Sequence, residues 1–364
     1  PAEAVNDAQA IAAWLGSYEG HSAHTLRALK KECHRFMAWL WSTRGADPSH
    51  LPKVGVADVN AYLRFLEAPV REPLTAEALR AFGFKAQPFR VEASLAASSI
   101  GQALVILHGM FEAMRNLRAG GGRPYIELNP FRLARKAKGR GRGREAERAL
   151  SAAECEALDA TIEALPRLSV EERAVYHRAR WLVALLVRSW FRRSEVARLV
   201  MGDFHRDPHG DGWVCTVQTK GGQDHTIVVT SQLLRELQVY RVSLGLPALP
   251  LPHDTLPAVG HLSSHDRHLT ADMVYKIVKD LVNATADRLT AGERAGEPEV
   301  ALMVSRLRSV SPHWFRHTGV TRALESGTDP RYAQAQAGHA SLATTMIYDH
   351  KDMRRQREQL ERVR

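Results

Sequence analysis

The chain has 364 residues and a formal net charge of +10. This length predicts two domains with sizeable cores, and the positive charge favours an anionic partner, most often nucleic acid. The three cysteines, Cys33, Cys155 and Cys215, lie far apart in the sequence, which argues against a disulfide framework or a zinc-binding pair and favours a reducing cytoplasm. No apolar run is long enough to cross a membrane, and the first residues lack the pattern of a signal peptide.

Residues 1–130 are predicted to form a helical domain. After Thr25, an apolar stripe of helical period runs through Leu26, Leu29, Cys33, Phe36, Met37 and Leu40. Four basic residues interleave with this stripe: Arg27, Lys30, Lys31 and Arg35. We expect them to form a basic face that contacts nucleic-acid phosphates.

Two further helices are predicted in this domain. One carries Val59, Tyr62, Leu63 and Leu66, with Asp58 near its start, and the other runs from Ile100 to Met114 with Ser98 as its cap. Between them, residues 68–92 are interrupted by prolines. We interpret this stretch as an insertion with a short helix at about residues 75–81.

Residues 131–150 are predicted to be a basic linker. Arginines alternate with glycines here, at Arg140, Arg142 and Arg144. Such a composition cannot bury a core, so we expect an extended strap. The strap could lie along a phosphate backbone, and a plain solvated linker is the alternative.

The second domain is predicted to span residues 151–364. Ser151 and Glu154 form a capping-box pattern at its first helix. An apolar helix from Glu171 to about Ser189 follows, and Arg192 sits at its end. A charged arginine in apolar surroundings needs a partner, and Glu195 is the nearest carboxylate in the sequence. Ser194 is expected to open the next helix.

A β-hairpin is predicted next, with strands at residues 213–218 and 224–229 and Lys220 in the turn between them. Helices are expected at residues 231–244 and 270–287, with an irregular segment between them and a mobile segment at residues 290–299. His205 and His209 share a loop, but without converging carboxylates they do not indicate a metal site.

The stretch from Ser311 to His350 contains several side chains that can take part in catalysis, and they lie close together in the sequence. Ser311 and Pro312 are predicted to begin a helix that projects His313 and Arg316 from one face. Gly327 and Gly338 provide turns at which the chain can fold back. His339 follows the second turn, and Tyr348 comes nine residues later.

These residue types suit phosphoryl transfer. An arginine can bind phosphate through two nitrogens, a histidine can move protons near neutral pH, and a tyrosine hydroxyl can attack phosphorus. The pattern HxxRH, then GH, then Tyr closely resembles the tyrosine recombinase (phage integrase) family. The stretch WFRRSEV is similar to the family pattern G-L-R-I-S-E-L, with Trp190 where the family usually has glycine.

The resemblance implies a mainly α fold with a small β-sheet, in which a helical SAM-like core-binding domain and a catalytic domain clamp around DNA. It implies that Tyr348 is the nucleophile, that Arg192 and Arg316 hold the phosphate, and that Lys220 protonates the leaving oxygen. His313 and His339 match the two histidines of the family, and Glu195 matches the acidic residue that supports the first arginine. The implied reaction requires neither a metal nor any other cofactor.

The resemblance further implies site-specific recombination of duplex DNA with an inverted-repeat core site. A dimer on each site, a tetramer in the synapse and accessory DNA-binding proteins belong to this expectation, as does a cytoplasmic, nucleoid-associated protein of a bacterium or phage. The charged tail after Tyr348 is expected to dock into a neighbouring subunit. Two alternatives remain open: a type IB topoisomerase and a DNA-binding protein without catalysis.

The linker arginines generate a first prediction. Neutralising Arg140, Arg142 and Arg144 should weaken binding to duplexes of any sequence, because phosphate contacts carry no sequence information. The log–log salt dependence of the binding constant should flatten by roughly one unit per lost phosphate contact. Gel-shift titrations across a salt series measure this slope, and an unchanged slope would mean that the linker is only a spacer.

Overall fold

Helices make up most of the chain in the computed structural model, which describes residues 4–45, 47–68, 94–119, 122–132, 148–218, 224–346 and 360. The chain divides into two compact units, Pro1–Gly141 and Arg142–Arg364. The helix predicted at residues 75–81 and the linker arginines lie outside the described residues. No helix in the described ranges is both long enough and apolar enough to span a bilayer.

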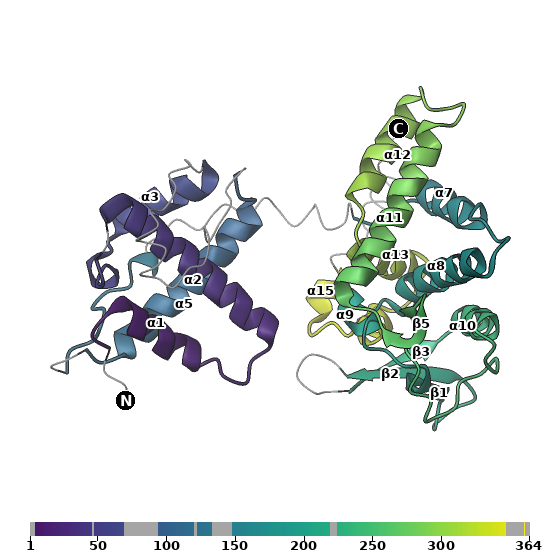
Figure 1. Cartoon of the computed structure of the whole chain (residues 1–364), viewed down its shortest axis with the longest axis horizontal. Coiled ribbons are helices and arrows are strands. Elements are labelled where there is room, and N and C mark those ends of the chain that lie inside the picture. Colours follow the sequence, from purple (N-terminus) through teal and green to yellow (C-terminus); the bar gives the residue numbers. More distant parts are fainter. Residues whose placement is uncertain are drawn as a thin grey trace. The chain divides into compact units, whose positions relative to one another are not determined.

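In its described residues the first unit contains four helices that pack together, α1 (Asp7–Gly16), α2 (Ala23–Arg44), α3 (Val56–Glu67) and α5 (Ala97–Asn116) (Figure 1). Short 3-10 turns lie at Leu51–Lys53 and Pro130–Arg132. The predicted apolar stripe of α2 supplies much of its core. Phe36 lies edge-on to Tyr62, with ring centroids 4.9 Å apart. The three predicted helices are confirmed, although α5 begins at Ala97 and not after a Ser98 cap.

The basic face of α2 is smaller than predicted. Arg27, Lys30 and Lys31 are exposed, but Arg35 is 5% exposed and pairs with Glu32 at 3.1 Å. The expected role of Arg35 in a basic surface is therefore wrong. Arg35 lies on the same side of the helix as the apolar stripe, and the buried carboxylate one turn earlier compensates its charge.

The second unit contains nine further helices in its described part. They are α7 (Ala152–Glu163), α8 (Val170–Ser189), α9 (Arg193–Val196), α10 (Ser231–Ser243), α11 (Ala271–Thr290), α12 (Pro298–Ser309), α13 (Pro312–Glu325), α14 (Pro330–Ala337) and α15 (Leu342–Met346). Helices α11 and α12 run side by side, and α8 packs against both α10 and α13 (Figure 1). The apolar face of α8 forms the centre of the core, where Trp181 donates to the Ala258 carbonyl at 2.7 Å.

Local capping signals fix several of these helix starts. The predicted capping box at Ser151 and Glu154 is present, and Ser169 and Glu172 form another at the start of α8. Glu154 is buried and also accepts from Arg306 of α12 at 2.7 Å. The same carboxylate thus begins α7 and ties it to a distant helix.

The sheet next to this core has the strand order β1 (Phe204–Arg206), β2 (Trp213–Gln218) and β3 (Asp224–Val229), all antiparallel. The bounds of β2 and β3 are those predicted. A two-stranded sheet of β4 (Gly260–His261) and β5 (Ser264–His268) lies in the segment expected to be irregular. It escaped prediction because β5 is polar at every position.

Two other expectations need correction. Helix α12 was not predicted, although Pro298 takes its first turn and Leu307 is buried. Helix α9 begins at Arg193 with Arg192 as its N-cap residue, and not at Ser194. Helix α9 is a single turn, too short to show a period, whereas α12 carries apolar residues at helical spacing, Val300, Met303, Val304 and Leu307, that the prediction overlooked.

The buried pair in α2 generates a stability prediction. Arg35→Ala should lower the free energy of unfolding by about 3–5 kcal/mol, because it leaves the Glu32 carboxylate buried and unpaired. Denaturant unfolding measures this loss. The exposed neighbour provides the matched control, since Lys31→Ala should stay within about 0.5 kcal/mol of the wild type. If Arg35→Ala left the stability unchanged and weakened DNA binding, Arg35 would belong to the basic face of α2 and not to a buried ion pair.

Candidate phosphate-binding site

The first turn of α13 carries most of the candidate site. Ser311 occupies the N-cap position and Pro312 the first helical position, as predicted. His313 and Arg316 therefore lie one turn apart on the same face. His313 is exposed, whereas Arg316 is 3% exposed.

The Arg316 guanidinium joins three segments of the chain. One terminal nitrogen donates to the carbonyl of Trp190, at the end of α8, and the other donates to the carbonyl of Ala337, at the end of α14. Each acceptor lies just ahead of another candidate residue, because Arg192 follows Trp190 by two positions and His339 follows Ala337 by two. Arg316 thus holds the chain segments of Arg192 and His339 against α13.

Arg192 presents its charge more openly than Arg316 does. Its side chain is 46% exposed, while that of its partner Glu195 is 6% exposed. The carboxylate accepts from the Arg192 guanidinium at 2.9 Å and from the Arg192 backbone N–H at 2.7 Å. The pairing expected from the sequence is present, and it fixes both the side chain and the backbone of Arg192.

His339 follows the left-handed turn that Gly338 makes at φ 61°. Its Nδ1 lies 2.9 Å from the Thr345 hydroxyl. The preceding helix α14 is fastened to strand β3: the Gln336 side chain pairs with both backbone groups of Val228, at 3.0 and 3.1 Å, and the His225 ring lies 2.8 Å from the Ala335 carbonyl. These bonds therefore hold the turn that carries His339 next to strand β3.

The Arg316 hydrogen bonds bring these groups together, and the electrostatics of the two histidines agree with this geometry. Desolvation, followed by the charges of Arg316 and Arg192, lowers the pKa of His339 to about 4. The same causes lower the pKa of His313. Both histidines therefore sit within coulombic range of both arginines and are neutral at pH 7. A phosphate entering this site would meet two guanidinium groups and would favour protonation of the histidines.

His317 belongs to this cluster but was not among the predicted site residues. It is 1% exposed, and its ring meets that of His313 edge-on with centroids 4.3 Å apart. Burial, and then the neighbouring His313, lowers the pKa of His317 to about 3. Its place directly after Arg316 in the HxxRH pattern was the available signal. No sequence signal predicted that the Trp190 and Ala337 carbonyls would contact Arg316, because every residue has a backbone carbonyl.

The structure does not describe all of the predicted site residues. Tyr348, Lys220 and the linker residues Arg140, Arg142 and Arg144 lie outside the described residues. Gln218 at the end of β2 and Asp224 at the start of β3 are the described residues nearest to Lys220 in the sequence, and they pair with each other. Helix α15 ends at Met346, two residues before Tyr348.

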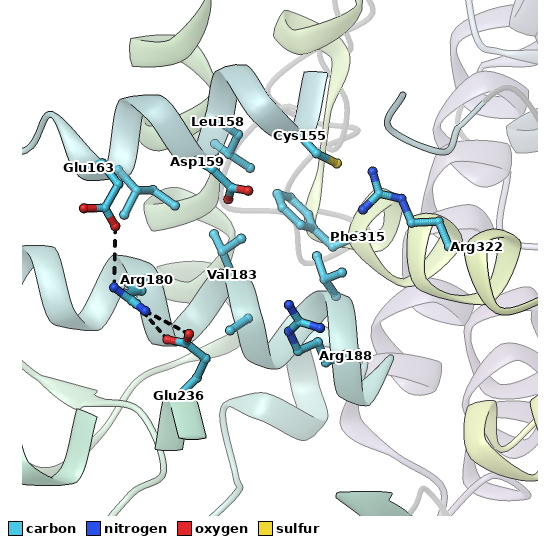
Figure 2. A pocket seen from close by; sticks show the side chains of 13 residues that line it. Cys155, Leu158, Asp159, Glu163, Arg180, Val183, Arg188, Glu236, Phe315 and Arg322 are labelled. Carbon is cyan, nitrogen blue, oxygen red and sulfur yellow. Dashed lines mark hydrogen bonds and ion pairs between the residues drawn. The ribbon is translucent and has the colours of Figure 1, made fainter. Parts of the chain in front are cut away.

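A separate cavity of about 330 Å³ lies between α7, α8, α10 and α13. Figure 2 shows Arg180 bridging Glu163 and Glu236, at 3.5 and 2.7 Å, on one side of it, and Arg322 opposite Cys155 on the other. None of the candidate histidines or site arginines lines this cavity. It belongs to the packing of helices around α13 and not to the candidate site.

Paired arginines beside neutral histidines form a charge pattern suited to an anionic group. The sequence profile of the phage integrase family matches residues 148–355, more than half of the chain. The chain belongs to this family.

Named relatives and solved structures agree with this assignment. The chain is 29% identical over 192 residues to tyrosine recombinase XerC of Pelobacter propionicus, covering 53% of the chain and 54% of that protein. It is 26% identical over 336 residues to tyrosine recombinase XerD of Corynebacterium glutamicum, covering 92% and 90%. The chain thus spans little more than half of the first relative but most of the second.

The fold is similar to that of XerH site-specific recombinase bound to a palindromic difH substrate, with a TM-score of 0.62, 17% identity and coverage of 93% of this chain and 80% of that one. A lambda integrase dimer bound to a core site gives a TM-score of 0.58, 15% identity and coverage of 95% and 78%. The predicted fold class, a helical domain followed by a mainly helical domain with small sheets, is confirmed.

The buried His317 generates a pH prediction. In the unfolded chain this imidazole takes up a proton near its ordinary pKa of 6.5, whereas the folded chain keeps it neutral down to about pH 3. The unfolded state therefore binds more protons in this window, and the free energy of unfolding should fall as the pH drops below about 6.5.

His317→Gln should make that fall shallower, as urea unfolding at a series of pH values will measure. His209→Gln is the matched control, because His209 is exposed, and it should keep the wild-type slope. A His317→Gln slope equal to that of the wild type would show that His317 is not held neutral.

Proposed function

We propose that this protein recombines duplex DNA at specific sites by cutting and rejoining strands through a covalent bond to Tyr348. The observation that carries the proposal is the pair of Arg316 hydrogen bonds to the Trp190 and Ala337 carbonyls, which hold the segments of Arg192 and His339 against the helical turn of His313. Such a site concentrates positive charge where a phosphodiester would gain charge in its transition state.

In the proposed cleavage step, the Tyr348 hydroxyl oxygen bonds to phosphorus and the bond from phosphorus to the 5′ oxygen breaks. Arg192 and Arg316 bind the non-bridging oxygens, and His339 donates a hydrogen bond to one of them. His313, neutral before the reaction, accepts the proton that leaves the tyrosine, and Lys220 gives a proton to the leaving 5′ oxygen.

The products are a 3′-phosphotyrosyl bond and a free 5′ hydroxyl. Because one phosphoester replaces another, the bond energy is conserved and neither ATP nor a metal is needed. Attack by a 5′ hydroxyl from a second duplex reverses the step and exchanges the strands through a Holliday junction.

The proposed partner is duplex DNA with an inverted-repeat core site, bound by a dimer and paired in a tetramer, in the cytoplasm. The related XerH and lambda integrase structures contain DNA, and the latter holds a dimer on a core site. On α2, the exposed Arg27, Lys30 and Lys31 offer phosphate contacts in the first unit. The relatives reported above are recombinases, which favours recombination over topoisomerase-like relaxation.

Tyr348→Phe tests the covalent step. The variant should bind target DNA like the wild type, because only the attacking hydroxyl is lost, and should form no covalent complex. The substrate is a duplex selected by binding from a random library and nicked beside the cleavage point, so that the released fragment diffuses away and the cleaved state accumulates. Denaturing electrophoresis then separates protein-linked DNA from free DNA.

The wild-type protein should be trapped on the 3′ side of the break. Trapping by Tyr348→Phe would mean that another residue is the nucleophile. Relaxation of a supercoiled plasmid without the target site, at a rate equal to cleavage of the target, would favour the topoisomerase alternative.

A further inference from the structure

Trp190 has an unusual backbone for its residue type. Within the described part of the chain it is the one residue other than glycine with a positive φ, at φ 60° and ψ 22°, where it ends α8 in the left-handed conformation. Bulky residues avoid this region because the side chain approaches the backbone, whereas glycine and asparagine enter it readily. Some other contact must therefore keep Trp190 there.

That contact is a close fit between the indole and α13. A methyl group added at Gly319 would lie 2.2 Å from Trp190 Nε1 and 2.3 Å from Trp190 Cδ1, so the ring occupies the space that a larger residue would need. Trp190 is 9% exposed and packs in a cluster with Val320, Leu324 and Ala337. The side chain of Trp190 is thus seated between α13 and the end of α14.

The left-handed turn has a consequence for both arginines. It directs the Trp190 carbonyl to the Arg316 guanidinium, and it sets the path of the chain into Arg192, the N-cap residue of α9. A residue that relaxed to the right-handed or extended region would rotate this carbonyl away and redirect the chain two positions before Arg192.

We propose that Trp190 is a positioning residue for the phosphate site, whose indole, locked over Gly319, holds a left-handed turn that places Arg316 and Arg192 together. The inference rests on the phosphate-binding roles proposed above for these two arginines. Trp190 itself acts through its backbone and not on the DNA.

Three substitutions separate this role from simple packing. Trp190→Gly, Trp190→Asn and Trp190→Ala all remove the indole, and glycine leaves the largest gap of the three. Glycine and asparagine can still form the left-handed turn, whereas alanine resists it. A packing role alone would make alanine equal to or better than glycine, because alanine keeps a side-chain carbon. A positioning role reverses that order.

The measurement is the rate of single-turnover cleavage of the nicked target duplex, at saturating protein and below the melting temperature of every variant. We expect Trp190→Ala to cleave about a hundredfold more slowly than the wild type, as for a misplaced reacting group. Trp190→Gly and Trp190→Asn should stay within about tenfold of the wild-type rate. Affinity for the intact duplex should be unchanged in all three, since the backbone contacts of the rest of the interface remain.

Leu324→Ala is the matched control, because Leu324 is 2% exposed in the same cluster but does not shape the turn. It should lower the melting temperature and leave the cleavage rate near that of the wild type. Equal cleavage by the three Trp190 variants, or faster cleavage by alanine than by glycine, would overturn the proposal. Failure of the wild-type protein to cleave would instead contradict the proposed function, so the two failures are distinguishable.

Discussion

The candidate site depends on the two hydrogen bonds that the Arg316 guanidinium donates to the carbonyls of Trp190 and Ala337. A buried guanidinium is costly unless its donors are satisfied, and carbonyl acceptors satisfy them without cancelling the positive charge. The same bonds fasten the ends of α8 and α14 to α13. One side chain therefore builds the local architecture and supplies charge to the site.

The surrounding groups extend this arrangement in two directions. Glu195 fixes Arg192 through both backbone and side chain, while Gln336 and His225 fix α14 to β3, the strand that follows Lys220 in the sequence. The histidines are kept neutral by desolvation and by the arginines. Such a site is organised before an anion arrives, so little reorganisation is required when phosphate binds.

The sequence was sufficient where the signal is local. The capping box of Ser151, the strands on either side of Lys220 and the pairing of Arg192 with Glu195 each depend on residues a few positions apart or on simple alternation. The sequence was insufficient where contacts between distant segments determine the structure. The carbonyl partners of Arg316 lie 126 and 21 positions away, and the burial of Arg35 depends on which face of α2 the other helices cover.

The central claim is that Arg192 and Arg316 together hold the scissile phosphate on a framework built by the Arg316 hydrogen bonds. A crystal structure of the protein on a nicked target duplex, with vanadate in place of the scissile phosphate, tests it most directly. We expect vanadate oxygens at about 2.7–3.2 Å from guanidinium nitrogens of both arginines, with Arg316 still bonded to the Trp190 and Ala337 carbonyls. Vanadate bound away from Arg316, or an Arg316 that has left both carbonyls, would contradict the account.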